Sequence, residues 1–275
     1  MSFARINGTD LFYAEAGEGA PIIFGHGITG SHYVWEPVTR RLQNRFRCIL
    51  SDFRGAGDSN QAKGPCTIAQ FADDIVGLAN HLALATFTYV GLSMGGVVGI
   101  QLGVTCPDRL EKLILVAPAP WGRKTAIDVP ERLRQLAKTG NEELIGNIFR
   151  AGLARDVSEE GEEYLRSRAR NLLTTSQEHL DIAPELEQDL SPAIATVQTP
   201  TLVVAGAADS LLQSNLADFA RLPNATLHVF SRVAHYVPID VPDALAELVV
   251  DFMEHGVVDT TTIQSRVAAA SQARV

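Results

Sequence analysis

The chain has 275 residues, 46% hydrophobic and 20% charged, so it can bury a large core without help from disulfides or metal ions. Its 32 acidic and 23 basic side chains leave a net charge of −9, which argues against a nucleic-acid surface and against docking on anionic membranes. No secretory signal pattern, no apolar run of about 18 residues and no CxxC pair is present, so we expect a cytoplasmic protein without a zinc site.

Strand and helix signals alternate through the first 120 residues. Asn7-Gly8, between two short β-rich segments, is typical of a hairpin turn because both residues tolerate a positive φ. The elements expected after it are a strand at 21–24, a helix at 35–44, a strand at 46–50, a helix at 68–84, a strand at 86–90, a helix at 97–104 and a strand at 113–116. Parallel strands need long, usually helical crossovers, so this pattern predicts an α/β fold with a mostly parallel sheet flanked by helices.

The alternation stops at about residue 120 and resumes at about 196. Residues 121–195 are charged and helix-prone, and we interpret them as a helical cap inserted into a core formed by 1–120 and 196–275. The helices expected in the cap are 130–138, 142–154, 159–173 and 177–190; those of the second core part are 216–221 and 242–254, beside strands at 201–205 and 226–230. The small, polar tail 256–275 is expected to be mobile or loosely docked.

A G-x-S-x-G motif at residues 91–95 lies between a β-rich run and a helix. A very tight strand-to-helix turn needs glycine on both sides of the serine, and it leaves the Ser93 hydroxyl exposed above the sheet. The helix that starts at Met94 also points free N–H groups at an anion forming beside that hydroxyl. The motif therefore predicts Ser93 as a nucleophile.

A serine hydroxyl is a weak nucleophile and needs a base. Of the seven histidines, His235 alone lies in the loop between the last strand and the last helix, at the carboxyl edge of the predicted sheet. Asp209 follows the strand at 201–205 at the same edge and is the candidate acid that holds the imidazole in one tautomer. The alternative for His235 is a capping or surface role, and the alternative for Asp209 is an N-cap or turn role.

Gly25-His26-Gly27-Ile28 ends an early buried strand. Glycine at that point lets the backbone approach a reacting carbonyl, so the N–H groups of Ile28 and Met94 are the candidate oxyanion hole. A simple strand-exit turn is the alternative. His26 is expected to support the site and not to act as a catalyst.

Together these residues resemble the α/β-hydrolase superfamily in its serine-nucleophile branch. The matching elements are Gly25-His26-Gly27, the loop from Asp52 to Ser59, the turn at Ser93 and the loops of Asp209 and His235, in the family's order of nucleophile, acid and base. The resemblance implies an α/β-hydrolase fold with a variable cap over the site. Arg54-Gly55 is similar to esterases, perhydrolases and enol-lactonases.

The resemblance and the residues together predict hydrolysis of a small ester or lactone through an acyl-enzyme, with a small-molecule partner and no metal or cofactor. The alternatives are a carbon–carbon bond hydrolase of ring-cleavage products and a ligand receptor that turns over slowly. Trp35, Trp121 and Phe149 are candidates for the apolar substrate lining, with core packing as their alternative. Arg123, Arg150 and Arg155 could receive an acidic substrate, although a solvated helix face is the plainer interpretation.

Overall fold

The computed structural model describes residues 2–119, 129–182, 191–258 and 260–272. Eight strands form a single sheet in the order β1-β2-β4-β3-β5-β6-β7-β8. The strands are β1 (Ser2–Ile6), β2 (Thr9–Ala16), β3 (Ala20–Gly25), β4 (Phe46–Ser51), β5 (Phe87–Leu92), β6 (Leu110–Val116), β7 (Thr201–Gly206) and β8 (Ala225–Phe230). The hairpin β1–β2 and the pair β2–β4 are antiparallel, and all other pairs are parallel, which confirms the predicted α/β-hydrolase fold with a mostly parallel sheet.

The local sequence accounts for the main elements. Asn7 and Gly8 both have positive φ, as the two-residue turn of the β1–β2 hairpin requires. Every residue of β5 and of β7 is buried, because these strands lie inside the sheet with helices on both faces, and their apolar runs therefore do not alternate with polar residues.

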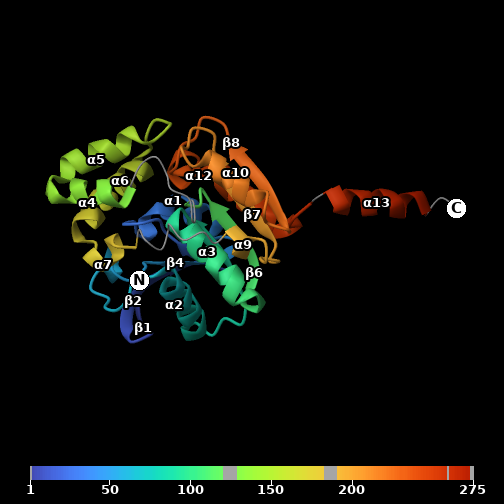
Figure 1. The fold of residues 1–275 in the computed structure, drawn as a ribbon, viewed down its shortest axis with the longest axis horizontal. Coiled ribbons are helices and arrows are strands. Elements are labelled where there is room, and N and C mark those ends of the chain that lie inside the picture. Colours follow the sequence, from blue (N-terminus) through green and yellow to red (C-terminus); the bar gives the residue numbers. More distant parts are fainter. Residues whose placement is uncertain (1, 120–128, 183–190, 259, 273–275) are drawn as a thin grey trace.

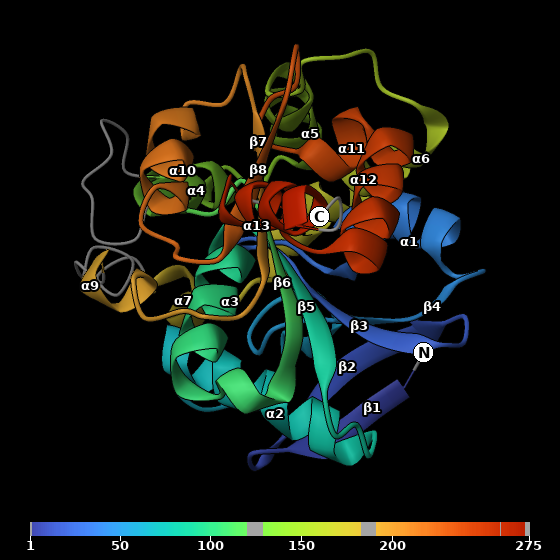
Figure 2. The same cartoon turned by 90° about the vertical axis from the view of Figure 1, so that its right-hand side faces the viewer.

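Helices cover both faces of the sheet (Figure 2). One face carries α1 (Glu36–Leu42) and α12 (Pro242–His255), which pack on each other, and the other carries α2 (Ile68–His81) and α3 (Met94–Thr105) with α10 (Leu212–Phe219). None of the described helices has both the length and the apolar character that crossing a membrane would require.

Of the helices that the structure describes between β6 and β7, four group together on one side of the molecule, and we name them the cap helices (Figure 1). They are α4 (Val129–Lys138), α5 (Glu142–Ala151), α6 (Glu159–Thr174) and α7 (Gln177–Leu180). The short α9 (Ser191–Ile194) leads from them toward β7. The helix predicted at 177–190 ends earlier than expected among the described residues, and its part at 183–190 lies outside them.

Several elements differ from the expectations, among them α10, which begins four residues before the helix predicted at 216–221. Strand β6 begins three residues before the predicted start, because Leu110 and Lys112 already pair with Phe87 and Thr88 of β5, with an irregularity of register between the two pairs. The tail contains a helix, α13 (Thr260–Gln272), that extends away from the body of the molecule (Figure 1).

A buried ion pair links helix α2 to the loop after β4. The Arg54 guanidinium donates two hydrogen bonds of 2.6 Å to the Asp74 carboxylate, and both side chains are almost fully buried. Asn7 and Gln70 also donate to this carboxylate. Arg54, which the sequence resemblance singled out, therefore has a structural partner.

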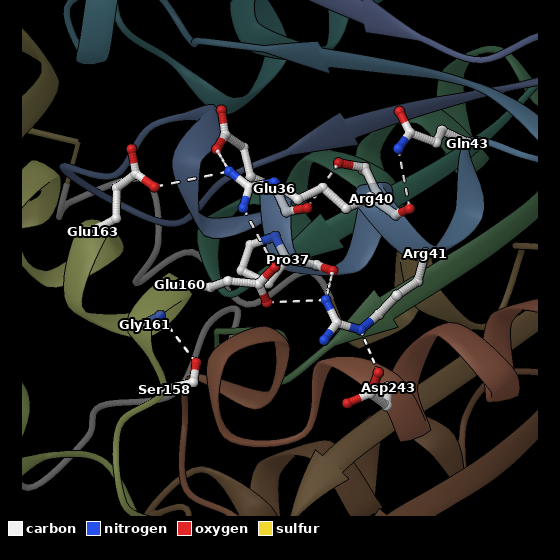
Figure 3. A network of polar contacts seen from close by, with 11 residues as sticks. Glu36, Pro37, Arg40, Arg41, Gln43, Ser158, Glu160, Gly161, Glu163 and Asp243 are labelled. Atoms are coloured by element: carbon white, nitrogen blue, oxygen red, sulfur yellow. Dashed lines mark hydrogen bonds and ion pairs between the residues drawn. The ribbon is translucent and has the colours of Figure 1, made fainter.

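The first turns of α6 are attached to the core by an exposed ion network (Figure 3). Arg40 of α1 contacts Glu160 at 3.3 Å and Glu163 at 3.8 Å, and Arg41 contacts Glu160 at 3.0 Å and Asp243 of α12. Exposed ion pairs contribute at most about 1 kcal/mol each, so this network alone holds the cap helices weakly.

Replacing the buried carboxylate by Asp74→Ala should lower the free energy of unfolding by about 3–5 kcal/mol, because it leaves the Arg54 charge buried without its partner. Asp73→Ala is the matched control, because Asp73 is the preceding residue of α2 and its side chain is exposed. This variant should change the free energy of unfolding by less than about 0.5 kcal/mol. Urea denaturation of the three proteins measures both effects. Equal losses in the two variants would contradict the structural role of the pair.

Candidate active site

The turn between β5 and α3 places Ser93 in a strained backbone conformation, with φ 56° and ψ −115°. A Cβ on Gly95 would lie 2.5 Å from the carbonyl oxygen of Gly25, and a Cβ on Gly91 would lie 2.1 Å from the carbonyl oxygen of Gly95. The motif glycines are therefore required by backbone contacts on both sides of the serine. The buried Tyr89 hydroxyl donates to the Gly95 carbonyl at 3.1 Å, and this hydrogen bond ties the turn to strand β5.

Asp209 and His235 are in direct contact. Nδ1 of His235 donates to Oδ2 of Asp209 at 2.8 Å, which leaves Nε2 of the imidazole as the free, basic nitrogen. The Asp209 side chain is 2% exposed and that of His235 is 27% exposed. Asp209 also accepts from the N–H of Leu211, so the turn role considered from the sequence and the contact with His235 occur together.

The pKa of Asp209 is lowered from its usual value. Burial by itself would raise this pKa, but the hydrogen bond and the positive charge that His235 offers outweigh it, and the Leu211 N–H adds to the effect. The carboxylate therefore stays ionised at neutral pH and can stabilise an imidazolium at His235.

Close backbone contacts hold the His235 loop beside the Asp209 loop. A Cβ on Gly206 would lie 2.4 Å from the carbonyl oxygens of Val233 and Ala234, so glycine is needed where the two loops touch. The N–H of Ala208 donates to the Val233 carbonyl at 2.9 Å. The pairing of the acid and the imidazole thus rests on the backbone as well as on their own hydrogen bond.

Ser93, Asp209 and His235 follow the strands β5, β7 and β8, which run parallel and end at one edge of the sheet. The structure brings the second and third of these residues into contact, whereas the described part of the chain shows no hydrogen bond between Ser93 and His235. Such bonds are often long in a protein without substrate and shorten when the substrate is bound.

The backbone at Gly27 lies against Ser93. A Cβ on Gly27 would be 3.2 Å from Cβ of Ser93 and 3.7 Å from its Oγ. Among the described residues, neither the N–H of Ile28 nor that of Met94 donates a hydrogen bond. Both candidate oxyanion-hole N–H groups, one directly after Ser93 and one directly after Gly27, are thus without an acceptor among the described residues.

His26 supports the peptide between Gly27 and Ile28. Its Nδ1 donates to the Gly27 carbonyl at 2.7 Å and its Nε2 accepts from the N–H of Phe53 at 3.0 Å, so the imidazole is neutral with its proton on Nδ1. Burial lowers the pKa of His26 to about 4. This geometry agrees with a supporting role for His26.

The predicted lining residues have different surroundings. Trp35 is fully buried and donates from its indole nitrogen to the Gly25 carbonyl at 3.0 Å, so it packs in the core and supports the end of β3. Phe149 is 7% exposed, and its ring lies 4.6 Å from the guanidinium carbon of Arg168. Trp121 lies outside the described residues.

Two of the three arginines considered as receptors of an acidic substrate have partners within the protein. Arg150 is paired with Glu162, and Arg155 donates to the backbone oxygens of Ser231 and Arg232. Arg123 lies outside the described residues.

Two buried side chains of the cap helices, Arg168 and His179, touch the loop after Gly27, and neither was predicted from the sequence as a site residue. Arg168 stands in the charged run Arg166-Ser167-Arg168-Ala169-Arg170, which is typical of a solvated helix face. Its distance of 139 residues from Thr29 left no local signal.

His32, Asp52 and Asp58 could offer metal ligands, since their ligand atoms lie within 4.8 Å of one another. The Asp52 carboxylate, however, already accepts from the N–H of Asp58 at 2.8 Å, from the N–H of His32 and from Nδ1 of His32 at 3.0 Å. Burial disfavours the charged imidazole, but the Asp52 carboxylate outweighs this and raises the pKa of His32. The cluster therefore fits a hydrogen-bonded structural role, in which Asp52 holds His32 and Asp58 together, better than a metal site.

Comparisons with known proteins agree with this geometry. Residues 20–242 match the family described as alpha/beta hydrolase fold. The chain is 32% identical over 251 residues to a protein of Caulobacter sp. (strain K31) named as a carbamate hydrolase, RutD, with 84% of this chain and 90% of that protein covered.

Two further matches cover nearly the whole chain. The 2-hydroxy-6-oxononadienedioate/2-hydroxy-6-oxononatrienedioate hydrolase 2 of Pseudomonas putida is 28% identical over 275 residues, with 92% of this chain and 96% of that protein covered. The crystal structure of the enol-lactonase from Burkholderia xenovorans LB400 has a TM-score of 0.80 at 26% identity, and the match covers 92% of this chain and 100% of that one.

A methyl group at Gly95 should disrupt the turn. In Gly95→Ala, the new Cβ would meet two backbone oxygens at 2.5 and 2.7 Å that cannot move aside, so we expect a loss of more than about 2 kcal/mol in the free energy of unfolding. In Gly146→Ala, the new Cβ in α5 meets nothing within 4 Å, so helix propensity should leave stability unchanged or raise it by up to about 1 kcal/mol. Thermal and urea unfolding compare the two; tolerance of alanine at 95 would refute the packing argument.

Stability should fall as the pH drops from about 6.5 to 4. Burial lowers the folded pKa of His26 to about 4, and burial with the nearby His26 lowers that of His179 to about 3, both from 6.5. In this window the unfolded chain binds protons that the folded chain does not, so stability is lost at up to about 1.4 kcal/mol per pH unit for each histidine. Urea denaturation at several pH values should show a shallower decline for His179→Gln; an unchanged slope would contradict this.

Proposed function

Because the chain belongs to the α/β-hydrolase family, we propose that it is a serine hydrolase that cleaves a small ester or lactone through an acyl-enzyme intermediate. The observation that carries the proposal is the Asp209–His235 hydrogen bond at the sheet edge where the strained turn presents Ser93. The match to the enol-lactonase structure over the full length of that chain supports a lactone or ester as the substrate. We propose that it acts in the cytoplasm on a small molecule, without a nucleic-acid or membrane partner.

In the first half of the reaction, Oγ of Ser93 attacks the carbonyl carbon while Nε2 of His235 takes the hydroxyl proton. The Asp209 carboxylate stabilises the imidazolium that results. The oxyanion of the tetrahedral intermediate accepts hydrogen bonds from the N–H groups of Ile28 and Met94. When the intermediate collapses, His235 gives its proton to the leaving oxygen, and the acyl group stays on Ser93.

In the second half, Nε2 of His235 takes a proton from a water molecule, and the resulting hydroxide attacks the acyl carbon. The same two N–H groups bind the second oxyanion. Collapse of this intermediate breaks the bond to Oγ of Ser93, which recovers the proton from His235. The products are a carboxylic acid and an alcohol, or one hydroxy acid or its keto form when the substrate is a lactone.

Carbon–carbon bond hydrolysis of a ring-cleavage product is the second candidate. The Pseudomonas putida relative, which covers 92% of this chain, carries the name of a hydrolase of 2-hydroxy-6-oxo acids. Turnover of vinylogous diketone acids with little hydrolysis of simple esters would favour this candidate over the first.

Ser93→Ala should lower turnover of the preferred ester or lactone by at least about 10⁴-fold, because the nucleophile is removed. The midpoint of thermal unfolding should change little, since the hydroxyl makes no hydrogen bond among the described residues. Product release in a screen of p-nitrophenyl esters and lactones measures the first effect, and a fluorophosphonate probe that labels wild type but not the variant confirms the site. Full activity of the variant would refute the assignment.

The same screen separates an enzyme from a receptor with slow turnover. An enzyme releases product steadily over many turnovers, whereas a receptor releases one equivalent per chain and stops. A burst followed by no further release would therefore exclude the proposed function while leaving Ser93 as a nucleophile.

A further inference from the structure

Thr29, which follows the candidate oxyanion-hole residue Ile28, has a left-handed backbone with φ 56°. A β-branched residue rarely adopts this conformation, so its surroundings must hold it there. Thr29 is fully buried, and solvent therefore cannot satisfy its polar groups. The partners of those groups decide where the Ile28 peptide lies.

All three polar groups of Thr29 are bound by side chains of the cap helices. Nη1 of Arg168, on α6, donates to the carbonyl oxygen and to the hydroxyl oxygen of Thr29. Nε2 of His179, on α7, accepts from the N–H of Thr29 at 3.3 Å. Nη2 of Arg168 also donates to the Ile28 carbonyl at 3.0 Å. Two side chains from the cap helices thus fix two successive peptides of a core loop.

Both cap side chains are themselves held in one orientation. His179 is fully buried and donates from Nδ1 to the Arg54 carbonyl at 2.9 Å, which leaves Nε2 as the acceptor for Thr29. Arg168 is 4% exposed, and its guanidinium lies over the ring of Phe149. Its bonds to three neutral oxygen atoms use its forked geometry, which a single ammonium group does not reproduce.

The core holds this loop at its beginning, Gly27, and at its end, where the N–H of His32 donates to the Asp52 carboxylate. Among the described residues, the Gly27 carbonyl accepts from Nδ1 of His26 and from the N–H of Gly30 at 3.0 Å, and this fixes one end of the Gly27–Ile28 peptide. The other end depends on the contacts of the cap helices with Ile28 and Thr29. An oxyanion-hole donor works only within a few tenths of an ångström of its correct position.

We propose that Arg168 and His179 are positioning residues that aim the Ile28 N–H at the oxyanion, so that the oxyanion hole is complete only while the cap helices are docked. This rests on the proposed acyl transfer at Ser93. The exposed network of Arg40, Arg41, Glu160 and Asp243 attaches the start of α6 but does not touch the loop (Figure 3). Attachment of the cap helices and alignment of the catalytic donor are therefore separable by mutation.

The test compares Arg168→Met with Arg150→Met in the full-length chain. Arg150 lies on α5 and pairs with Glu162 of α6 on the surface, so its loss removes an arginine from the same helices without touching the loop. With p-nitrophenyl acetate as substrate, Arg168→Met should lower kcat by on the order of 10²-fold, as loss of one oxyanion-hole donor does, with KM within about twofold of wild type. Arg168→Lys should recover part of kcat, and Arg150→Met should equal wild type.

The rate of Ser93 labelling by a fluorophosphonate probe gives a second readout, because phosphonylation also places negative charge on an oxygen beside the serine. Arg168→Met should be labelled more slowly than wild type by a similar factor. If that variant does not fold, His179→Leu, which removes the acceptor for the Thr29 N–H together with the donor to the Arg54 carbonyl, should show the same slow labelling with native circular dichroism.

Two results would overturn the positioning role alone. One is a labelling rate and kcat of folded Arg168→Met equal to wild type, and the other is a raised KM with unchanged kcat, which would make Arg168 a substrate-binding group. Wild type that resists both labelling and turnover would instead refute the proposed function itself.

Discussion

The contact between the Gly95 backbone and the carbonyl end of β3 is the constraint on which the site depends. A Cβ at Gly95 would overlap the carbonyl oxygens of Gly25 and His26, so helix α3 begins as close to the next strand as two backbones can come. This approach places the serine turn and the loop after Gly27 side by side. The strained φ of Ser93 is maintained because packing on both sides leaves the turn no other conformation.

The parallel strands bring the other two residues of the site to the same edge of the sheet as Ser93. The loops that follow β5, β7 and β8 all leave at the same edge, so residues more than a hundred positions apart in the chain reach one place. At the far end, Gly206 permits the loops of Asp209 and His235 to touch, and the carboxylate and imidazole then complete the contact. Glycine at positions of close backbone approach thus builds both halves of the site.

The cap helices are attached by two kinds of contact with different energetics. Ion pairs on the surface, such as those of Arg40 and Arg41, are screened by solvent and hold α6 only loosely. The contacts of Arg168 and His179 with Thr29 are buried, where an unmade hydrogen bond costs far more than a made one gains. The buried contacts therefore act at the loop that carries Ile28, whereas the ion pairs act at the start of α6.

The sequence by itself determined the α/β pattern, the serine turn and the residues Asp209 and His235 as partners, because each of these follows from local signals: apolar runs, glycine spacing and position after a strand. It left Trp35 open between substrate lining and core packing, where the structure shows a core residue, and it assigned no role to Arg168. Only the tertiary structure decided that Arg168 and His179 bind Thr29. Those hydrogen bonds join segments 139 and 150 residues apart, and a buried polar contact between distant segments leaves no periodicity or motif in either one.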